Sequence, residues 1–180
     1  MALLNEVQRV CTQLEHRDID RETFLEEITR LATTAIGCSR TGLWIFADTA
    51  QGRILHCLGM YDGLQQRMVQ VADETLEIEP YFRALEHTGY VSAPSVHDHT
   101  ATAGLFAGRL ALRGVHSLLA VSFSVNGQLY GAFTCTEVRH AVDWSPSQLT
   151  TLRRIAARAS VALFNTNRVT GTTGLMPLGD

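Results

Sequence analysis

The chain has 180 residues, of which 46% are hydrophobic and 18% charged, with a formal net charge of −3 at pH 7. This composition excludes disorder over most of the length and provides no basic field for nucleic acid or an anionic membrane surface. There is no lysine, which excludes Schiff-base and P-loop chemistry. The chain also lacks a signal-like start and any apolar run of membrane-spanning length. We expect one cytoplasmic domain with a tail.

The first predicted element is a helix with a narrow apolar seam. Its apolar residues recur at spacings of three and four, the period of one helix face. After a polar break at residues 15–18, Asp20 can cap a second helix, and Gly37 stands where a glycine commonly ends one. The seam of the first helix consists of Leu3, Val7, Val10 and Leu14.

The pattern then changes from helical to extended. Runs rich in β-branched and aromatic residues, bounded by turn-forming residues, indicate strands, and Pro80 can open a short helix. Residues 94–100 form a polar loop rich in histidine. The predicted elements are strands at 42–47 and 53–58, a helix at 80–85, a strand at 90–93 and a helix at 105–112.

The strongest local signal is the pair Asn126-Gly127 between two β-rich runs. Both residues reach positive φ at low cost, as a type I′ turn requires, so the pair predicts a hairpin with Val125 opposite Gln128. Neither face of this hairpin is polar, which favours a central position between two layers. The predicted register gives one face Leu118, Ala120, Ser122, Leu129, Gly131, Phe133 and Cys135, and the other Leu119, Val121, Phe123, Tyr130, Ala132 and Thr134.

The last predicted helix begins at Ser145, with Pro146 in its first turn and Gln148 placed for a capping box. Its apolar residues form a second seam. Paired seams are typical of a homodimer built from helices, although they equally fit helices that pack on their own sheet. After Phe164 the composition is that of a flexible tail. The second seam consists of Leu149, Leu152, Ala156, Ala159 and Leu163.

Taken together, the order of elements and several short stretches resemble the GAF domain family over residues 20–165. The resemblance is closest to the GAF modules that precede histidine kinase or diguanylate cyclase domains in bacterial sensors. It implies an α+β fold with an antiparallel sheet in the order 2-1-5-4-3, terminal helices on one face, and short helices and loops over a pocket on the other. The matching stretches are IGCSRTGLWIF (36–46), LGMYD (58–62), PYFRAL (80–85), the hairpin and DWSPSQL (143–149).

The resemblance further implies a sensory domain of bacterial signal transduction rather than an enzyme. We expect an N-terminal helix at 1–17 as a candidate for dimerisation, a GAF domain at 18–165 and a flexible tail at 166–180. The expected partners are a second copy of the chain, an unknown small molecule, and a histidine kinase or diguanylate cyclase in the same chain or a separate one. Neither nucleic acid nor a membrane is an expected partner.

Departures from the family pattern bear on the ligand. Phytochrome-like members attach bilin to a cysteine where this chain has Leu105 and Phe106, so covalent bilin is not expected. The cyclic-nucleotide signature of phosphodiesterase GAF domains contains a lysine, which this chain lacks. Only Asp98 of a paired-aspartate pattern is kept, and the cofactor therefore stays unknown.

The predicted site is apolar with a few polar groups, as suits a small planar ligand. The resemblance points one hairpin face at the ligand, with aromatic side chains closing the site; the competing interpretation is that this face is filled core. The candidate ligand-binding residues are Tyr81, Phe82, Tyr90, His97, Phe106, Arg109, Leu118, Ala120, Ser122, Phe133 and Cys135.

Other functions remain open beside the sensor. A ligand-free dimerisation or interaction module would explain the eroded motifs. A cysteine-based redox enzyme of the methionine sulfoxide reductase type would need a reactive Cys135 and a resolving thiol, and Cys57 is no assured partner. His97 and His99 flank Asp98 in the polar loop, but a solvated loop is the more common explanation, so neither a metal site nor a catalytic site is predicted.

Overall fold

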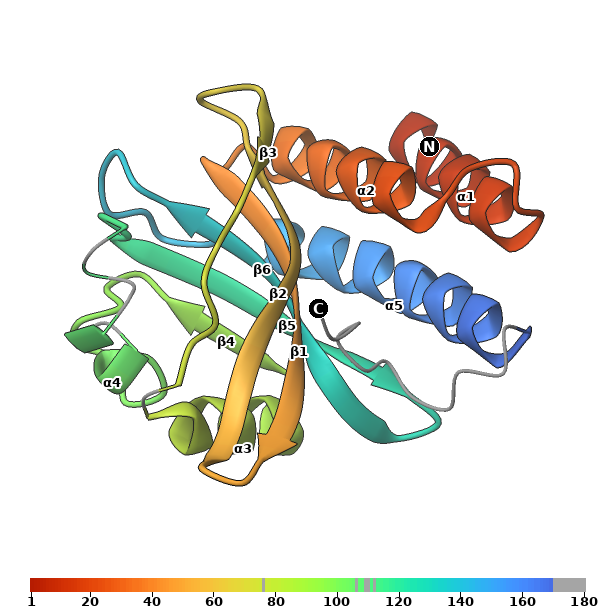
Figure 1. The fold of residues 1–180 in the computed structure, drawn as a ribbon. Coiled ribbons are helices and arrows are strands. Elements are labelled where there is room, and N and C mark those ends of the chain that lie inside the picture. The colour runs from red at the N-terminus through yellow and green to blue at the C-terminus, as the bar shows by residue number, and fades with distance from the viewer. Residues whose placement is uncertain (76, 106, 109–110, 112, 170–180) are drawn as a thin grey trace.

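The computed structural model describes the whole chain except residues 76, 106, 109–110, 112 and 170–180. A six-stranded antiparallel sheet, in the order β3-β2-β1-β6-β5-β4, separates two layers of helices (Figure 1). Within the described part, no helix combines the length and apolarity needed to cross a membrane. The elements are α1 Ala2–Glu15, α2 Arg21–Ile36, β1 Arg40–Thr49, β2 Gly52–Asp62, β3 Arg67–Val69, α3 Ile78–Thr88, β4 Tyr90–Ala93, α4 Ala103–Leu105, β5 Ser117–Val125, β6 Gln128–Glu137 and α5 Pro146–Val169.

The predicted fold class and strand order are confirmed. The sequence did not predict β3, a short strand that pairs with the end of β2 at one edge of the sheet. Without β3, the remaining five strands follow the expected order 2-1-5-4-3. Of the predicted helix at 105–112, Leu105 lies in α4 and residues 107, 108 and 111 are also helical, whereas residues 106, 109, 110 and 112 lie outside the described part.

Helices α1, α2 and α5 cover one face of the sheet, and α3 and α4 lie on the other (Figure 1). Each face has its own apolar core. The core under α1, α2 and α5, here called the helix-side core, includes Phe24, Ile28, Leu43, Leu119 and Ile155. The core on the other face, here called the cavity-side core, includes Trp44, Tyr81, Leu85, Leu118 and Ala120.

The predicted helix ends are confirmed by their hydrogen bonds. Asp20 Oδ1 accepts from the backbone N–H of Thr23 at 2.8 Å, and Gly37 ends α2 with φ at 74°. Ser145 and Gln148 form the capping box, with distances of 3.1 and 2.8 Å. Gln148 Nε2 also donates to the Ile36 carbonyl oxygen at 2.9 Å, which ties the start of α5 to the end of α2.

The hairpin turn is confirmed, but the pairing keeps the predicted register only for the first two residues of β6. Asn126 and Gly127 have φ values of 52° and 76°. Val125 pairs with Gln128 as predicted, yet Phe123 pairs with Gly131, so Tyr130 is an extra residue, a β-bulge. A shift by one residue moves each later side chain of β6 to the opposite face.

The expectation that Phe133 and Cys135 share a face with Leu118 and Ala120 was therefore wrong. Phe133 pairs with Val121 and Cys135 with Leu119, and both lie in the helix-side core. Ala132 moves to the cavity-side core in exchange. Thr134 lies on the same face as Ala132, and its hydroxyl accepts a hydrogen bond from Nε1 of Trp44, a residue of the cavity-side core, at 3.2 Å.

The two apolar seams pack within the chain. Val7, Val10 and Leu14 of α1 are buried in the same core as Leu152 and Leu163 of α5. At the edge of this contact, Arg158 donates to Glu15 at 2.9 and 3.0 Å. The homodimer stays a prediction, and its interface has to lie on surfaces of these helices that the chain leaves exposed. Helix α5 extends through residues 166–169, which were expected in the tail.

Candidate functional site

A small cavity lies between the sheet and the segments that cover it on the side of α3 and α4. Its free volume is about 30 Å³, enough for a molecule the size of water. Strands β1, β2, β5 and β6 provide most of the wall. The residues that line it are Arg40, Trp44, Leu55, Met60, Glu74, Tyr81, Leu105, Arg113, Val115, Leu118, Thr134 and Thr136.

An ion pair between Glu74 and Arg113 lies at this cavity. Their side chains are 6% and 19% exposed, so both charges are largely removed from water. Glu74 is held in place by two backbone hydrogen bonds with Leu55, each 2.9 Å long. The guanidinium carbon of Arg113 lies 5.4 Å from the centre of the Trp44 ring, and burial lowers the pKa of Arg113.

The hydroxyl of Tyr81 is buried at the cavity and has no hydrogen-bond partner within the described residues, whereas Glu74 and Arg113 pair with each other. Tyr81 is 1% exposed, and burial raises the pKa of its phenol, so the hydroxyl stays protonated. Thr134 is already engaged, since its hydroxyl donates to the Gly42 carbonyl oxygen at 3.3 Å and accepts from Trp44. Buried hydroxyls are rarely left unpaired, because an unmade hydrogen bond costs about 1–3 kcal/mol.

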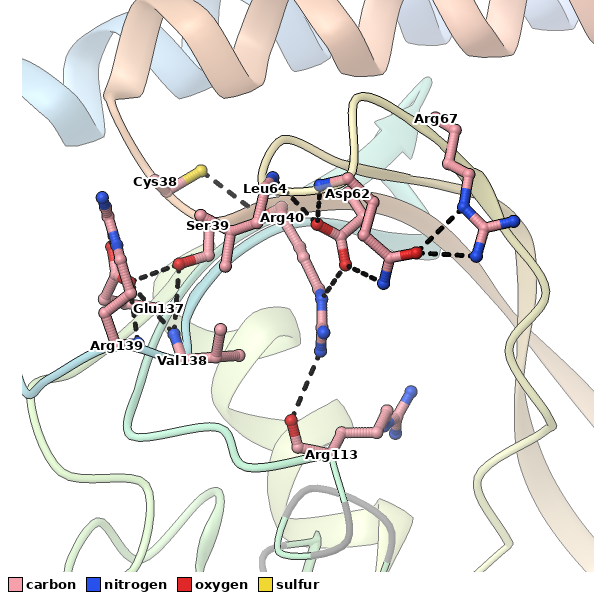
Figure 2. A network of polar contacts seen from close by, with 11 residues as sticks. Cys38, Ser39, Arg40, Asp62, Leu64, Arg67, Arg113, Glu137, Val138 and Arg139 are labelled. Carbon is pink, nitrogen blue, oxygen red and sulfur yellow. Dashed lines mark hydrogen bonds and ion pairs between the residues drawn. The ribbon is translucent and has the colours of Figure 1, made fainter.

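Arg40 connects the cavity wall to the segment that precedes β5 (Figure 2). Its Nε donates to Asp62 Oδ2 at 2.8 Å, and its Nη1 donates to the Arg113 carbonyl oxygen at 3.3 Å. Asp62 Oδ1 also accepts from the backbone N–H groups of Leu64 and Gln65 at 2.9 and 3.0 Å. Burial alone would raise the pKa of Asp62, but these hydrogen bonds and the charge of Arg40 lower it.

A second part of the network lies beside Arg40, where β1 begins and β6 ends (Figure 2). Ser39 Oγ donates to Glu137 Oε1, and Arg139 Nη2 donates to Glu137 Oε2 at 2.8 Å. The bonds from Arg139 and Ser39 lower the pKa of Glu137 from 4.5 to about 2. The backbone N–H of Ser39 donates to the Thr136 carbonyl oxygen at 3.1 Å. This network therefore joins β6 to the loop that follows α2.

A family model for the GAF domain matches residues 20–163. The chain belongs to the GAF domain family. No curated protein shows significant sequence similarity to the chain.

Solved structures of photoreceptor proteins resemble this chain in fold. The far-red-absorbing dark state of JSC1_58120g3 with bound biliverdin IXa has a TM-score of 0.70 at 13% identity, covering 90% of this chain and 99% of that one. The blue-light-absorbing PixJ GAF domain of Thermosynechococcus elongatus has a TM-score of 0.64 at 15% identity, with coverages of 88% and 92%. The bacteriophytochrome RpBphP3 of R. palustris has a TM-score of 0.69 at 12% identity, with coverages of 92% and 37%. At these identities the likeness shows the fold alone.

Among the predicted site residues of this GAF domain, Tyr81 and Leu118 line the cavity. Ala120 is buried in the same core without lining it. Phe133 and Cys135 face the helices on the other side of the sheet. Phe106 and Arg109 lie outside the described residues.

The remaining predicted residues lie away from the cavity. Phe82 and Ser122 line a separate open groove of about 540 Å³ between α3 and the β5–β6 hairpin. Ser122 Oγ donates to the Gly89 carbonyl oxygen at 3.2 Å. Tyr90 is exposed at the sheet edge, where the Arg153 guanidinium lies 4.8 Å from its ring centre. His97 is exposed in the loop after β4.

Sequence reasoning missed most of the polar residues of the cavity. Trp44 and Thr134 could have been found from strand alternation once the bulge in β6 was known. Glu74 and Arg113 lie in segments without periodicity, and no local signal marks them. Arg40 was quoted in a matching stretch without a role. The cavity forms from segments spread between residues 40 and 136, which local patterns do not bring together.

The cysteines and histidines do not form the redox site or the metal site that the sequence left open. Cys57 packs against the cavity-side core and Cys135 lies in the helix-side core, so the sheet separates this pair. Burial raises the pKa of Cys57 to about 12. His99 Nδ1 accepts from the Ala101 N–H at 3.1 Å, and the described residues contain no cluster of three or more His, Cys, Asp or Glu placed to hold a metal ion.

Proposed function

We propose that this GAF domain is a non-catalytic sensory domain that binds a small molecule in the cavity beside Tyr81, without a covalent bond. The buried, unpaired hydroxyl of Tyr81 is the observation that supports the proposal most directly. A ligand that accepts a hydrogen bond there would remove the cost of leaving it unmade. Trp44 and Leu118 offer apolar surface for the rest of the ligand.

The size of the cavity sets a condition on binding. A ligand larger than water has to displace part of the cover, which includes Leu105, Arg113 and Val115. The Arg113 carbonyl oxygen is held by Arg40, and its guanidinium pairs with Glu74. A ligand with an anionic group could take the place of Glu74 beside Arg113, so that entry would exchange one ion pair for another.

The proposed output passes through the terminal helices. Thr136 lines the cavity and also joins the network of Ser39 at the end of α2, while Gln148 ties α2 to α5. We propose that a bacterial histidine kinase or diguanylate cyclase, in the same chain or a separate one, receives the signal in the cytoplasm. The small free volume favours a second candidate, a ligand-free interaction module whose cavity is filled core.

Native mass spectrometry of protein purified without unfolding tests the proposal. We expect a non-covalent adduct that leaves the chain on denaturation, and a Tyr81→Phe variant that retains much less of it. Tyr130→Phe is the matched control, because its hydroxyl lies outside the cavity and contacts Gln128 at 3.4 Å. Wild-type protein without any adduct, together with Tyr81→Phe and Tyr130→Phe variants of equal stability, would favour the interaction module.

A further inference from the structure

Two thiols meet in the helix-side core, on the opposite side of β6 from the cavity. Cys38 Sγ lies 3.5 Å from Thr41 Oγ1, and Cys135 Sγ lies 3.7 Å from the same oxygen. Both thiols therefore contact the same hydroxyl group, and Cys38 Sγ also donates to the Arg40 carbonyl oxygen at 3.4 Å. The other two cysteines, Cys11 and Cys57, are free thiols elsewhere in the structure.

The local fold explains why these residues meet. Cys38 follows Gly37, which ends α2, and Thr41 pairs with Cys135 across β1 and β6. The bulge at Tyr130 turns Cys135 toward the helices; in the unshifted register its side chain would point to the cavity face. The backbone hydrogen bond from Ser39 to Thr136 holds the loop after α2 to β6. Cys38 and Cys135 are the residues that directly precede Ser39 and Thr136, so this bond keeps their backbones close together.

The two thiols differ in reactivity. Cys38 is 7% exposed, and its polar surroundings, Cys135 first and then Thr41, lower the pKa of its thiol. Cys135 has no exposed surface, and burial raises the pKa of its thiol. Burial also raises the pKa of Cys11 to about 11. Because the thiolate is the nucleophile, Cys38 is the thiol best suited to react with a small oxidant.

We propose that Cys38 and Cys135 are a peroxide-sensitive thiol pair that closes to a disulfide. The Cys38 thiolate attacks one oxygen of hydrogen peroxide, the O–O bond breaks, and a sulfenic acid and hydroxide form. The sulfur of Cys135 then attacks the sulfenic sulfur, the S–S bond forms, and the sulfenic oxygen leaves as water with the proton of Cys135. The hydroxide takes up the proton that Cys38 had lost. Two thiols are oxidised, and one peroxide is reduced to two waters.

The test counts thiols in the folded full-length chain. The reduced protein has four free thiols. After treatment with hydrogen peroxide we expect two, and a non-reduced digest should contain a peptide linked through Cys38 and Cys135. Dithiothreitol should restore all four. Cys38→Ser should keep its three thiols, and Cys135→Ser should fall from three to two, because Cys38 then stops at the sulfenic acid. Cys57→Ser, the matched control, should fall from three to one.

Folding is monitored separately, because Cys135 is fully buried and its replacement can destabilise the core. Circular dichroism shows whether each variant is folded. If Cys135→Ser is unfolded, the thiol count of Cys38→Ser, at the edge of the core, tests the proposal by itself. The proposal is overturned if wild-type protein keeps four thiols, if the linked peptide contains Cys11 or Cys57, or if Cys38 reaches sulfinic acid without a cross-link. None of these outcomes depends on a ligand in the cavity.

Discussion

Arg40 donates a hydrogen bond from Nε to Asp62 Oδ2 over 2.8 Å, and the two residues are also directly opposite each other in the β1–β2 ladder. Their side chains are 19% and 1% exposed. The pair therefore holds the end of β2 to the start of β1 where little water can replace either partner. Removing one partner of such a pair leaves the other charge poorly solvated.

We predict that Asp62→Ala lowers the free energy of unfolding by about 3 kcal/mol, because it leaves Arg40 and two backbone N–H groups without their acceptor. Asp48→Ala is the control. Asp48 also pairs with an arginine, Arg53, but its side chain is 79% exposed, so the loss should be below about 1 kcal/mol. Urea unfolding of both variants measures the difference. Equal losses in the free energy of unfolding would show that the buried Arg40–Asp62 pair stabilises the fold no more than the exposed Asp48–Arg53 pair.

Glu137 should make the stability depend on pH in the acid range. Its pKa is about 2 in the folded protein against an ordinary value of 4.5, so the folded state favours the charged form. The resulting stabilisation is fully present above pH 4.5 and is lost as the pH falls from 4.5 toward 2.

Glu137→Gln should therefore flatten the fall in stability between these pH values, while also lowering stability at pH 7. Urea unfolding at several pH values provides the measurement. Glu86→Gln, a change of an exposed glutamate on α3, is the control. A Glu137→Gln profile parallel to that of the wild type would contradict the assignment.

Gly131 permits the close approach of β6 to β1 just after the bulge. A Cβ at this position would overlap the Trp44 carbonyl group and lie 2.9 Å from Ile45 Cα, all backbone atoms of the neighbouring strand. We predict that Gly131→Ala lowers the free energy of unfolding by about 3 kcal/mol or more.

Gly59→Ala is the comparison for this prediction. There the nearest atom to the added Cβ is the terminal methyl of Met68, at 3.0 Å, which can move with its flexible side chain. The expected loss is about 1 kcal/mol or less. Thermal or urea unfolding separates the two variants, and a small loss for Gly131→Ala would show that β1 and β6 can separate without cost.

The predicted homodimer can be separated from the packing of the monomer. Leu152 is fully buried, so Leu152→Glu should unfold the chain rather than dissociate a dimer. Leu4 on α1 and Val161 on α5 are 39% and 47% exposed. Val161→Glu should keep the fold and give a monomer by light scattering; wild-type protein that is monomeric at high micromolar concentration excludes the dimer.

Local chemistry predicted the elements of this fold well. The cap at Asp20, the capping box of Ser145 and Gln148, and the turn at Asn126-Gly127 all depend on neighbours in the sequence, and all three form as predicted. Five of the six strands were predicted from residue type and turns, and the family resemblance supplied their order. The missed strand, β3, has three residues, which is too short for a pattern.

The cavity was harder to predict because it depends on register and on distant segments. A tyrosine does not predict a bulge by its residue type, yet the bulge at Tyr130 determines which face of the sheet Phe133 and Cys135 lie on. The ion pair joins residues far apart in the chain, Glu74 in a single β-bridge with Leu55 and Arg113 in a turn. Such pairings follow from tertiary packing, which the amino-acid pattern of either segment does not contain.

Strand β6 contributes side chains to both cores of the domain. Thr134 and Thr136 face the cavity, whereas Phe133 and Cys135, their neighbours in the strand, pack beneath the helices. A molecule that pushes against Thr134 cannot displace it without displacing the backbone that also supports Phe133 and Cys135. Because the interior is tightly packed, a shift of this backbone would also shift the helices that pack on Phe133 and Cys135. Strand β6 alone would then couple the cavity to the helices, without a hinge between them.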